Sequence, residues 1–319
     1  MTGVLAAVVN YRRPDLTARA VKAVLESTYG PPRVAVVDVG STAGTRSDLR
    51  RVLPRSVAIA ALDQNRGYAA AVNAAHALAR RAGSAAVLVL NNDIVVDPSC
   101  LDALVAARDA VAEPVAAVSA VTLSADEETV LCGGVDVLVT LGRARHLFIG
   151  ARIDELPERP YDVDAVEGSC VLLDVASFED IGGFDESFFM YWEDTEWSVR
   201  ARRAGFRLLV APAARARHDV GASTRPIARV ELLIKNRIRF VRRTADWPAQ
   251  LVFAMYFLGF WVPAYLPLKL APSFGWRASM GILARSVRCN VREIFAVEAN
   301  KGGPRLPTEY REMPESWSR

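Results

Sequence analysis

The densest group of chemically useful side chains lies between Phe188 and Trp197, where three acids stand among five aromatic residues. Glu193 and Asp194 are adjacent, and Trp192 precedes them. Aromatic faces suit sugar rings, and a carboxylate among them can act as a general base for a sugar hydroxyl. The two acids could instead stabilise the N-terminus of a following helix, where negative charge is favourable. These residues alone leave both interpretations open.

A second polar group, Asn91-Asn92-Asp93, follows an apolar run. A carboxylate there can hold Mg²⁺ or Mn²⁺ against two phosphates, because these ions prefer oxygen ligands and keep water or phosphate at their other positions. His218 could complete such a metal site or touch a diphosphate. The alternative is a turn that only caps the next segment.

Other residues are suited to a nucleotide. Asp38 ends a Val-rich run and can accept hydrogen bonds from a base imide or a ribose hydroxyl. The stretch from Asn65 to Asn73 opens a helix with small residues, which let the backbone approach a ligand, and a helix N-terminus favours phosphate. Arg66 is the side chain in this stretch that we assign to the nucleotide. The alternatives are a loop carboxylate at Asp38 and an Ala-rich helix that simply packs.

Strands and helices alternate through the first half of the chain, and their order determines where these side chains lie. Continuous apolar runs predict strands at 4–9, 34–37, 57–62 and 85–90, with helices at 16–25, 46–53 and 67–81. This pattern predicts a parallel sheet covered on both faces, which binds ligands at the carboxyl ends of its strands. Four polar residues fall just past those ends: Asn10, Asp38, Asp63 and Asp93.

The rest of the chain is less regular between residues 115 and 174. Strands are predicted there at 135–139 and 163–166, followed by a helix over 193–204 that Gly205 ends and a strand at 207–210.

From residue 229 the character changes, so we divide the chain into domains at 1–228 and 229–319. Residues 229–243 are basic and amphipathic, which suits either an anionic membrane surface or packing on the first domain. Residues 251–268 are almost wholly apolar but contain Pro263 and Pro267, which favours a hairpin or in-plane helices over a membrane span. Membrane contact is therefore expected through 229–295. A Pro-rich tail at 302–319 is expected to be poorly ordered.

Composition narrows the classes of function. The net charge of +3 does not indicate a dedicated nucleic-acid binder, and 51% hydrophobic residues can build a large core. The apolar segment after residue 251 accounts for the positive mean hydropathy of +0.15. The N-terminus lacks the features of a secretory signal, so we expect a cytoplasmic protein that is peripheral at the inner face of the cell membrane.

Six segments, taken in order, resemble motifs of the family 2 glycosyltransferases, and bacterial rhamnosyl- and galactofuranosyltransferases in particular. They are VVNYRRPDL, VVDVGSTAGT, NRGYAAAVNAA, LVLNNDIVVDP, the segment from VEGSC to RARRAGFRL, and ARARHDVGAS. The resemblance implies the α/β GT-A fold, with a mostly parallel central sheet flanked by helices and a helical C-terminal extension. Residues 1–228 would then be the catalytic domain.

The resemblance also implies a reaction. A sugar would pass with inversion from a UDP- or dTDP-linked donor to a hydroxyl of a glycan, lipid-linked or natural-product acceptor, and a homodimer is one possible assembly. Asp194 would be the catalytic base, and Asp93 with His218 would hold Mg²⁺ or Mn²⁺. The nucleotide would contact Asn10, Tyr11, Asp38, Asp63, Arg66, Asn73 and Asn92. The acceptor or sugar would contact Gly168, Trp192 and Glu193.

Two departures from the family pattern bear on this reading. Asn91 and Asn92 stand where other members carry Asp, so strict metal dependence is in question, and Val39 and Ala43 replace an Asn and an Asp. A nucleotidyltransferase would need a Gly-rich, Lys-containing phosphate loop, and a nicotinamide enzyme would need G-x-G-x-x-G after its first strand. Neither motif stands near the N-terminus. A catalytically inactive sugar-nucleotide or membrane-binding relic of the same fold is the remaining alternative.

Overall fold

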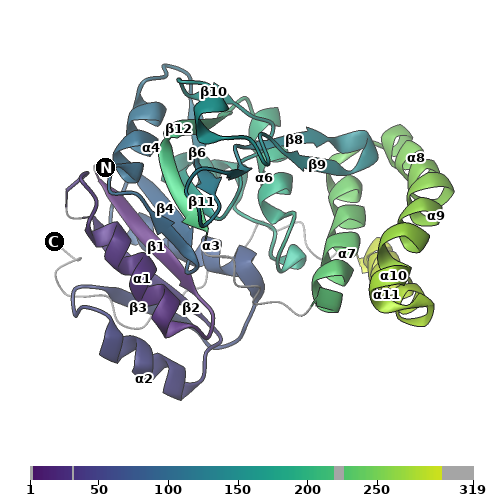
Figure 1. The fold of residues 1–319 in the computed structure, drawn as a ribbon, viewed down its shortest axis with the longest axis horizontal. Helices are drawn as coiled ribbons and strands as arrows, with labels where there is room; N and C mark the ends of the chain where they lie inside the picture. Colours follow the sequence, from purple (N-terminus) through teal and green to yellow (C-terminus); the bar gives the residue numbers. More distant parts are fainter. Residues whose placement is uncertain (1–2, 31, 219–225, 297–319) are drawn as a thin grey trace.

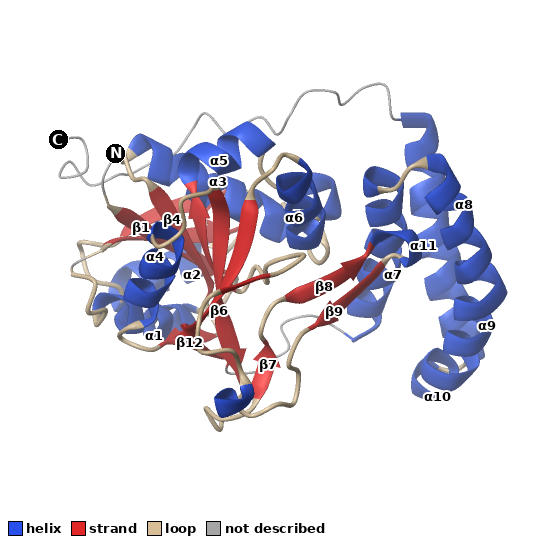
Figure 2. Cartoon of the chain, turned by 90° about the horizontal axis from the view of Figure 1, so that it is seen from above, coloured by secondary structure: helices blue, strands red, loops and turns tan. Residues whose placement is uncertain are grey.

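The computed structural model describes residues 3–30, 32–218 and 226–296 and shows an α/β domain followed by a helical region (Figure 1, Figure 2). The large sheet has the strand order β10-β12-β6-β11-β4-β1-β2-β3, with β5 pairing β12 and β7 pairing β6. Its strands are β1 (Val4–Asn10), β2 (Arg33–Val39), β3 (Ala58–Leu62), β4 (Ala86–Asn91), β5 (Ile94–Val96), β6 (Val115–Leu123), β7 (Val130–Cys132), β10 (Tyr161–Asp162), β11 (Cys170–Asp174) and β12 (Arg207–His218). A separate hairpin pairs β8 (Val135–Leu138) with β9 (Arg143–His146).

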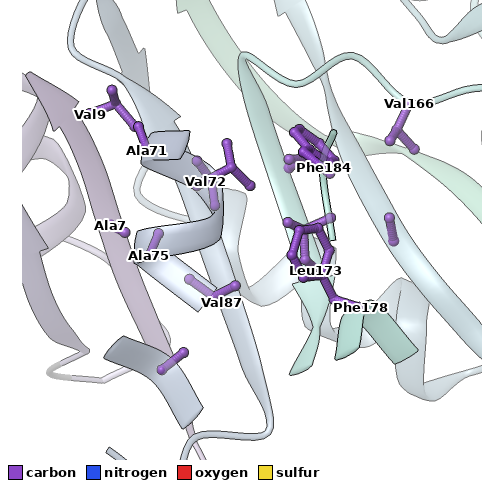
Figure 3. Close-up of a cluster of buried hydrophobic side chains, with 14 of the residues drawn as sticks. Ala7, Val9, Ala71, Val72, Ala75, Val87, Val166, Leu173, Phe178 and Phe184 are labelled. Carbon is purple, nitrogen blue, oxygen red and sulfur yellow. The ribbon is translucent and has the colours of Figure 1, made fainter. Parts of the chain in front are cut away.

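Helices cover both faces of the sheet because alternate residues of each strand point to opposite sides. The helices of this domain are α1 (Pro14–Leu25), α2 (Ala43–Val52), α3 (Gly67–Arg81), α4 (Cys100–Asp109), α5 (Val175–Ile181) and α6 (Glu193–Arg203). In β1, Val4, Ala6 and Val8 belong to one buried cluster, and Leu5, Ala7 and Val9 belong to the other. Figure 3 shows part of the second cluster, where side chains of α3 meet those of β1 and β4.

The strand register places the predicted polar residues at one edge. Strand β1 is parallel to β2 and β4, with Asn10 opposite Asp38 and Val9 opposite Asn91. Strand β11 runs antiparallel to β4, so its first residue, Cys170, lies beside Leu90 at the carboxyl end of β4. The Asn91 N–H donates to the carbonyl of Ser169 over 3.0 Å. The segment before β11 therefore lies at the same edge as the ends of β1, β2 and β4.

Two expectations about the middle of the chain are wrong. Residues 115–174 are not irregular as a whole, since β6 and β11 are central, buried strands of the sheet. Residues 163–166 do not form a strand. Ala165 makes only an isolated bridge to Val135, and the paired strand in this part of the chain is β10.

The C-terminal region begins with α7 (Pro226–Thr244), so the division expected at residue 228 falls in its first turn. A continuous helical run follows: α8 (Trp247–Tyr256), η4 (Phe257–Trp261), α9 (Val262–Tyr265), η5 (Leu266–Leu270) and α10 (Ala271–Phe274). After Gly275, α11 (Trp276–Ala296) returns to pack against α7 (Figure 1). The tail at 302–319 lies outside the described residues.

The hairpin expected within residues 251–268 is absent from this helical run. Pro263 and Pro267 do not break it, because η4 and η5 are π-helical and widen the backbone beside each proline. The run Trp247–Phe274 is long and apolar enough to cross a membrane by length and composition, which is weak evidence by itself.

Helix α7 packs on the first domain rather than presenting a free basic face. Asn236, Arg237 and Arg239 are buried in it, and its apolar residues Ile234 and Phe240 share a cluster with Phe188. Of the two interpretations of this amphipathic segment, the structure supports packing.

Candidate active site

Asp194 lies in the first turn of α6 and is held by three hydrogen bonds. Its Oδ2 accepts from the Gly168 N–H at 3.0 Å, while its Oδ1 accepts from the Thr195 N–H at 2.6 Å and the Thr195 hydroxyl at 3.1 Å. Burial raises the pKa of this carboxyl above its ordinary value, and the hydrogen bonds from Gly168 and Thr195 oppose the rise. Asp194 is therefore a fixed carboxylate whose affinity for a proton is increased, as a general base requires.

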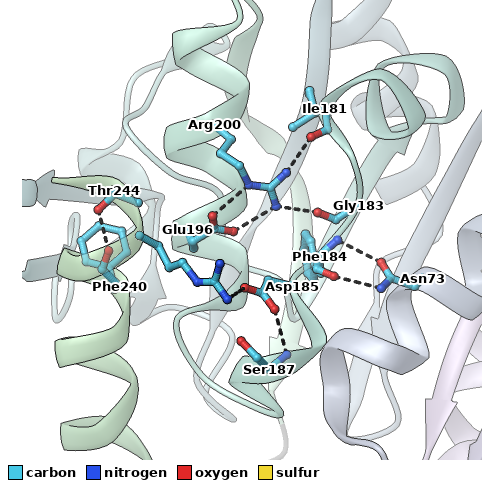
Figure 4. Close-up of polar contacts among 11 residues, drawn as sticks. Asn73, Ile181, Gly183, Phe184, Asp185, Ser187, Glu196, Arg200, Phe240 and Thr244 are labelled. Atoms are coloured by element: carbon cyan, nitrogen blue, oxygen red, sulfur yellow. Dashed lines mark hydrogen bonds and ion pairs between the residues drawn. The ribbon is translucent and has the colours of Figure 1, made fainter. Parts of the chain in front are cut away.

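The other two acids of this segment have different surroundings. Glu193 is almost fully buried, its Oε2 has no hydrogen-bond partner, and burial followed by the charge of Asp194 raises its pKa well above the ordinary value. Glu196 receives two hydrogen bonds of 2.9 Å from Arg200, which also binds the carbonyls of Ile181 and Gly183 (Figure 4). Glu196 is thus committed to fixing α6, and the unpaired oxygen belongs to Glu193.

Gly168 joins these carboxylates to the sheet edge. Its carbonyl accepts a hydrogen bond from the Tyr68 hydroxyl, and a side chain at this position would lie 3.4 Å from Asp194 Oδ2. Burial, followed by the charges of Glu193 and Asp194, raises the pKa of Tyr68 well above its ordinary value. Beside Gly168, Glu167 accepts a hydrogen bond of 2.6 Å from Thr122. Tyr68 and Glu167 could not be predicted from the sequence as site residues, because neither stands at a predicted strand end or beside another acid.

Trp192, expected to contact acceptor or sugar, packs partly against the C-terminal region. Its ring lies 4.9 Å from that of Phe240 in α7, and it is half-buried. The contact with a sugar stays a prediction for the remaining exposed part of this ring.

Three of the expected nucleotide-binding residues meet at the ends of β1, β2 and β4. Asp38 Oδ1 accepts hydrogen bonds from Asn10 Nδ2 at 2.7 Å and from the Ser41 hydroxyl at 2.6 Å. Asn10 Oδ1 accepts from the Thr17 hydroxyl at 2.6 Å and from Asn92 Nδ2 at 3.5 Å. The other oxygen of Asp38, Oδ2, is buried without a hydrogen bond and lies 3.5 Å from Arg46 Nε. This oxygen has unused capacity to accept a hydrogen bond.

The remaining expected nucleotide contacts are more dispersed. Tyr11 lies under the guanidinium of Arg12, and the Asp63 side chain is 97% exposed, with one oxygen 3.9 Å from Arg46 Nη2. Arg66 pairs with Glu186. Asn73 is buried, and its amide donates to and accepts from the backbone of Phe184 at 2.9 Å (Figure 4). The geometry of Asn73 favours positioning of the 184–186 segment over direct contact with a nucleotide.

The N-terminus of α3 does not offer the phosphate site that the sequence suggested. The carbonyl of Phe189 accepts hydrogen bonds from the N–H groups of Tyr68 at 2.6 Å and Ala69 at 3.5 Å, and Asn65 Oδ1 accepts from the Gly67 N–H. A Cβ at Gly67 would lie 2.1 Å from the Phe189 oxygen. The small residues at the start of α3 let the loop that contains Phe189 approach the helix. The first N–H groups of α3 already have acceptors, so they are not available to a phosphate.

Asp93 and His218 meet, as the sequence suggested. Strand β5 pairs with the end of β12, which places His218 opposite Ile94 and brings its Nε2 to 3.2 Å from Asp93 Oδ2. Asp93 Oδ1 is buried and has no hydrogen-bond partner. In the part of the chain that the structure describes, no three His, Cys, Asp or Glu side chains gather to hold a metal. One free carboxylate oxygen beside a histidine nevertheless fits Mg²⁺ or Mn²⁺, which take one or two protein carboxylates together with substrate phosphates and water.

Comparison with solved structures identifies the fold. The chain superposes on GalNAc-T7 with UDP, GalNAc and Mn²⁺ with a TM-score of 0.59 and 15% identity, covering 97% of this chain and 60% of that one. Residues 1–349 of S. aureus TarS give a TM-score of 0.53 and 15% identity, covering 92% and 83%. The mannosyltransferase PcManGT from Pyrobaculum calidifontis, in complex with GDP-Man and Mn²⁺, gives 0.52 and 20%, covering 93% and 79%. The fold is GT-A.

Sequence comparison agrees. The chain is 30% identical over 245 residues to the N-acetylglucosaminyl-diphospho-decaprenol L-rhamnosyltransferase of Mycobacterium tuberculosis, covering 70% of this chain and 78% of that enzyme. It is 35% identical over 228 residues to the O-antigen biosynthesis protein RfbC of Myxococcus xanthus, covering 67% of this chain and 17% of RfbC. The model of the glycosyltransferase-like family 2 matches residues 2–242. The chain therefore belongs to glycosyltransferase family 2 and is a glycosyltransferase.

Proposed function

We propose that this enzyme transfers a sugar, with inversion, from a UDP- or dTDP-linked donor to a hydroxyl of a lipid-linked glycan. A free glycan or a natural product is the alternative acceptor. The observation that carries the proposal is the half-buried carboxylate of Asp194, fixed by Gly168 at the sheet edge that also holds Asp38 and the Asp93–His218 pair. A base for the acceptor hydroxyl, a hydrogen-bond acceptor for the nucleotide and a site for the diphosphate would then lie along one edge, where two substrates can meet.

In the proposed reaction, Asp194 takes the proton from the acceptor hydroxyl. The acceptor oxygen forms a bond to the anomeric carbon from the face opposite the diphosphate, and the bond from that carbon to the diphosphate oxygen breaks. Where His218 is not a ligand of the metal, its imidazole would donate a hydrogen bond to the leaving diphosphate. Asp93 and His218 would hold Mg²⁺ or Mn²⁺, which would offset the diphosphate charge. Asp38 Oδ2 would accept from the base or ribose, and holding both substrates in line supplies much of the rate.

The acceptor class is inferred from a relative and from one surface. The mycobacterial relative is named for an acceptor linked to a lipid diphosphate. In this chain the run Trp247–Phe274 leaves large apolar side chains exposed, among them Trp247 at 76%, Leu258 at 64% and Leu268 at 72%. Such an apolar surface fits a membrane that presents the acceptor. We define the apolar face as Trp247, Leu251, Met255 and Leu258.

Contact in the plane of the membrane fits this helix better than a span. Phe253, Phe257, Trp261 and Tyr265 stack along its other side, where Arg237 of α7 lies 4.8 Å from the Trp261 ring centre. Arg237 also donates to the carbonyls of Leu141 and Gly142 in the first domain. One side of this helix packs along its length against the rest of the protein, so only the opposite side can be buried in lipid. The enzyme would be peripheral at the cytoplasmic face of the membrane, and assembly as a homodimer stays a prediction.

A donor panel tests the proposal. The full chain is incubated with Mn²⁺, a polyprenyl-diphosphate-linked glycan and UDP-, dTDP- or GDP-sugars in turn, and release of nucleoside diphosphate is followed. Acceptor-dependent release from a UDP- or dTDP-sugar, with an inverted anomeric centre by NMR, is the expected result. Binding of nucleotide without release from any donor would favour the inactive relic, and release with retention would exclude Asp194 as the base of a single displacement.

A further inference from the structure

The loop directly before Asp194 has an unusual backbone. Phe189, Tyr191 and Trp192 have φ angles of 65°, 72° and 76°, in the left-handed region that side-chain-bearing residues rarely adopt. Each such residue costs about 1–2 kcal/mol unless its surroundings hold it in place. This cost falls on the turn that sets the first residues of α6, Glu193 and Asp194. Something outside the loop must therefore stabilise it.

Helix α7 supplies that stabilisation through Asn236, which is fully buried. Its Nδ2, which carries two hydrogens, lies within hydrogen-bonding distance of three carbonyls, those of Phe188 at 2.7 Å, Met190 at 2.8 Å and Tyr191 at 3.0 Å. The Phe188 carbonyl also accepts from the Met190 N–H at 2.8 Å. The remaining carbonyl of the series, that of Phe189, is taken by the N-terminus of α3. Every carbonyl from 188 to 191 thus has a donor, and the loop is fixed between α3 and α7.

The orientation of the Asn236 amide is itself fixed. Arg239, also buried, donates to Asn236 Oδ1 at 3.2 Å and to the carbonyl of Ser187. One turn further along α7, Arg243 pairs with Asp185 at 3.3 Å. With Oδ1 occupied by a cation, Nδ2 must face the loop.

We infer that Asn236 is a positioning residue for the transfer reaction, an inference that rests on the proposed function. The Asn236 side chain makes its hydrogen bonds to the 188–191 loop and to Arg239, so it would act on the reaction through the loop. It holds the left-handed loop so that α6 begins where the Asp194 carboxylate meets the Gly168 N–H. A residue of the C-terminal helical region thereby controls the geometry of the base. A displacement of about 1 Å at a catalytic group can cost roughly 100-fold in rate.

Two substitutions of the same type separate positioning from stability. Asn236→Leu keeps the branching at Cγ and the number of heavy atoms, and it removes the amide that serves the carbonyls of Phe188, Met190 and Tyr191. Asn290→Leu is the matched control, because Asn290 is also buried in the helical region and donates to the carbonyls of Lys235 and Ser286 without touching the loop. Asn236→Gln keeps the donor but displaces it by one methylene, which supplies a milder variant if the leucine variant does not fold.

Hydrogen exchange measured by mass spectrometry on the full chain reports the loop without relying on activity. We expect exchange across residues 188–197 to be at least about 10-fold faster in Asn236→Leu than in Asn290→Leu, and intermediate in Asn236→Gln, because buried carbonyls without donors destabilise the loop. Equal protection of this segment in the Asn236 and Asn290 variants would overturn the inference.

Kinetic measurements on the same variants test whether the loop controls the position of the Asp194 carboxylate. Asn236→Leu should lower kcat by roughly 100-fold and move the acidic limb of its pH profile, while the affinity for UDP or dTDP stays within about twofold of that of Asn290→Leu. Faster loop exchange with an unchanged kcat and pH profile would overturn the positioning role. A wild-type chain that transfers no sugar would instead overturn the proposed function, and the exchange data would still decide whether Asn236 holds the loop.

Discussion

The backbone N–H of Gly168 lies 3.0 Å from Oδ2 of Asp194, and this hydrogen bond joins the first turn of α6 to the edge of the sheet. Gly168 is one residue from Ser169, whose carbonyl binds the N–H of Asn91. The proposed base, Asp194, and the proposed metal ligand, Asp93, are thus linked through a few backbone hydrogen bonds. These hydrogen bonds hold together the two parts of the site that, on the proposed function, align the donor and the acceptor.

The pH dependence of turnover should reveal the environment of Asp194. Because burial raises its pKa and the base acts only when ionised, kcat should fall as the pH is lowered, with a midpoint above the ordinary aspartate range. Thr195→Val removes a hydroxyl donor that stabilises the ionised form, so it should move the acidic limb to higher pH. Rates measured from pH 4 to 9 at saturating substrates test both. An acidic limb at the ordinary aspartate value, unmoved by Thr195→Val, would contradict the assignment.

The metal requirement should depend on Asp93. Asp93→Asn removes the charge of the carboxylate whose Oδ1 is free, and the Mn²⁺ concentration for half-maximal activity should rise about 10-fold or more. His218→Gln should also raise the Mn²⁺ concentration that gives half-maximal activity.

Asp97→Asn is the control for this titration, because Asp97 lies on the same segment but follows β5 at its other end. Its Mn²⁺ dependence should match that of the wild type. Turnover that persists in excess EDTA and is unaffected by Asp93→Asn would show that the enzyme works without a metal.

Gly67 should be intolerant of a side chain. A Cβ there would lie 2.1 Å from the Phe189 carbonyl oxygen, and φ is +87°. Gly67→Ala should lower the free energy of unfolding by about 3 kcal/mol or more, since it combines a steric clash with an unfavourable backbone conformation.

Gly83, just beyond the other end of α3, separates these two costs, because its φ is +67° and a Cβ would meet nothing within 4 Å. Gly83→Ala should cost only about 1–2 kcal/mol. Urea unfolding of both variants provides the comparison. If Gly67→Ala and Gly83→Ala lowered the free energy of unfolding equally, the close approach of Phe189 to α3 would add nothing to the cost at Gly67.

Membrane binding should require the apolar face. Replacing Leu251, Met255 and Leu258, which are 53–64% exposed, with Glu should abolish flotation with vesicles that contain anionic lipid, since burial of each apolar side chain contributes about 1.5–3 kcal/mol. Activity on a short-chain, water-soluble acceptor should remain. The control is Leu25→Glu with Val52→Glu, two exposed apolar residues of α1 and α2. Undiminished flotation of the triple variant would place membrane contact elsewhere.

The first strands and the polar residues after them are predictable from the sequence, because continuous apolar runs are typical of parallel strands, whose carboxyl ends share one edge. Asn10, Asp38 and Asn92 meet for that reason. Strand β6 is not predicted from the sequence. Four of its nine residues are Ala or Ser, which favour strands weakly.

The contacts that fix the site could not be predicted in the same way. Three contacts join residues far apart in the sequence: the Phe189 carbonyl at α3, the Tyr68 hydroxyl at the Gly168 carbonyl, and the Asn236 amide at the carbonyls of residues 188, 190 and 191. Such contacts depend on how loops pack between helices, and no local spacing encodes them. The same packing fills the N-terminus of α3, for which the sequence left a phosphate site and a simply packed helix as alternatives.

The central claim is that Asp194 is the base, and Asp194→Asn tests it most directly, since asparagine keeps the size and removes the proton acceptor. Single-turnover transfer and nucleotide binding by calorimetry are measured on the same preparation with saturating Mn²⁺. We predict a loss of transfer of about 10³-fold or more, with the dissociation constant for UDP or dTDP within about twofold of the wild-type value. Near-normal turnover in Asp194→Asn would contradict the account.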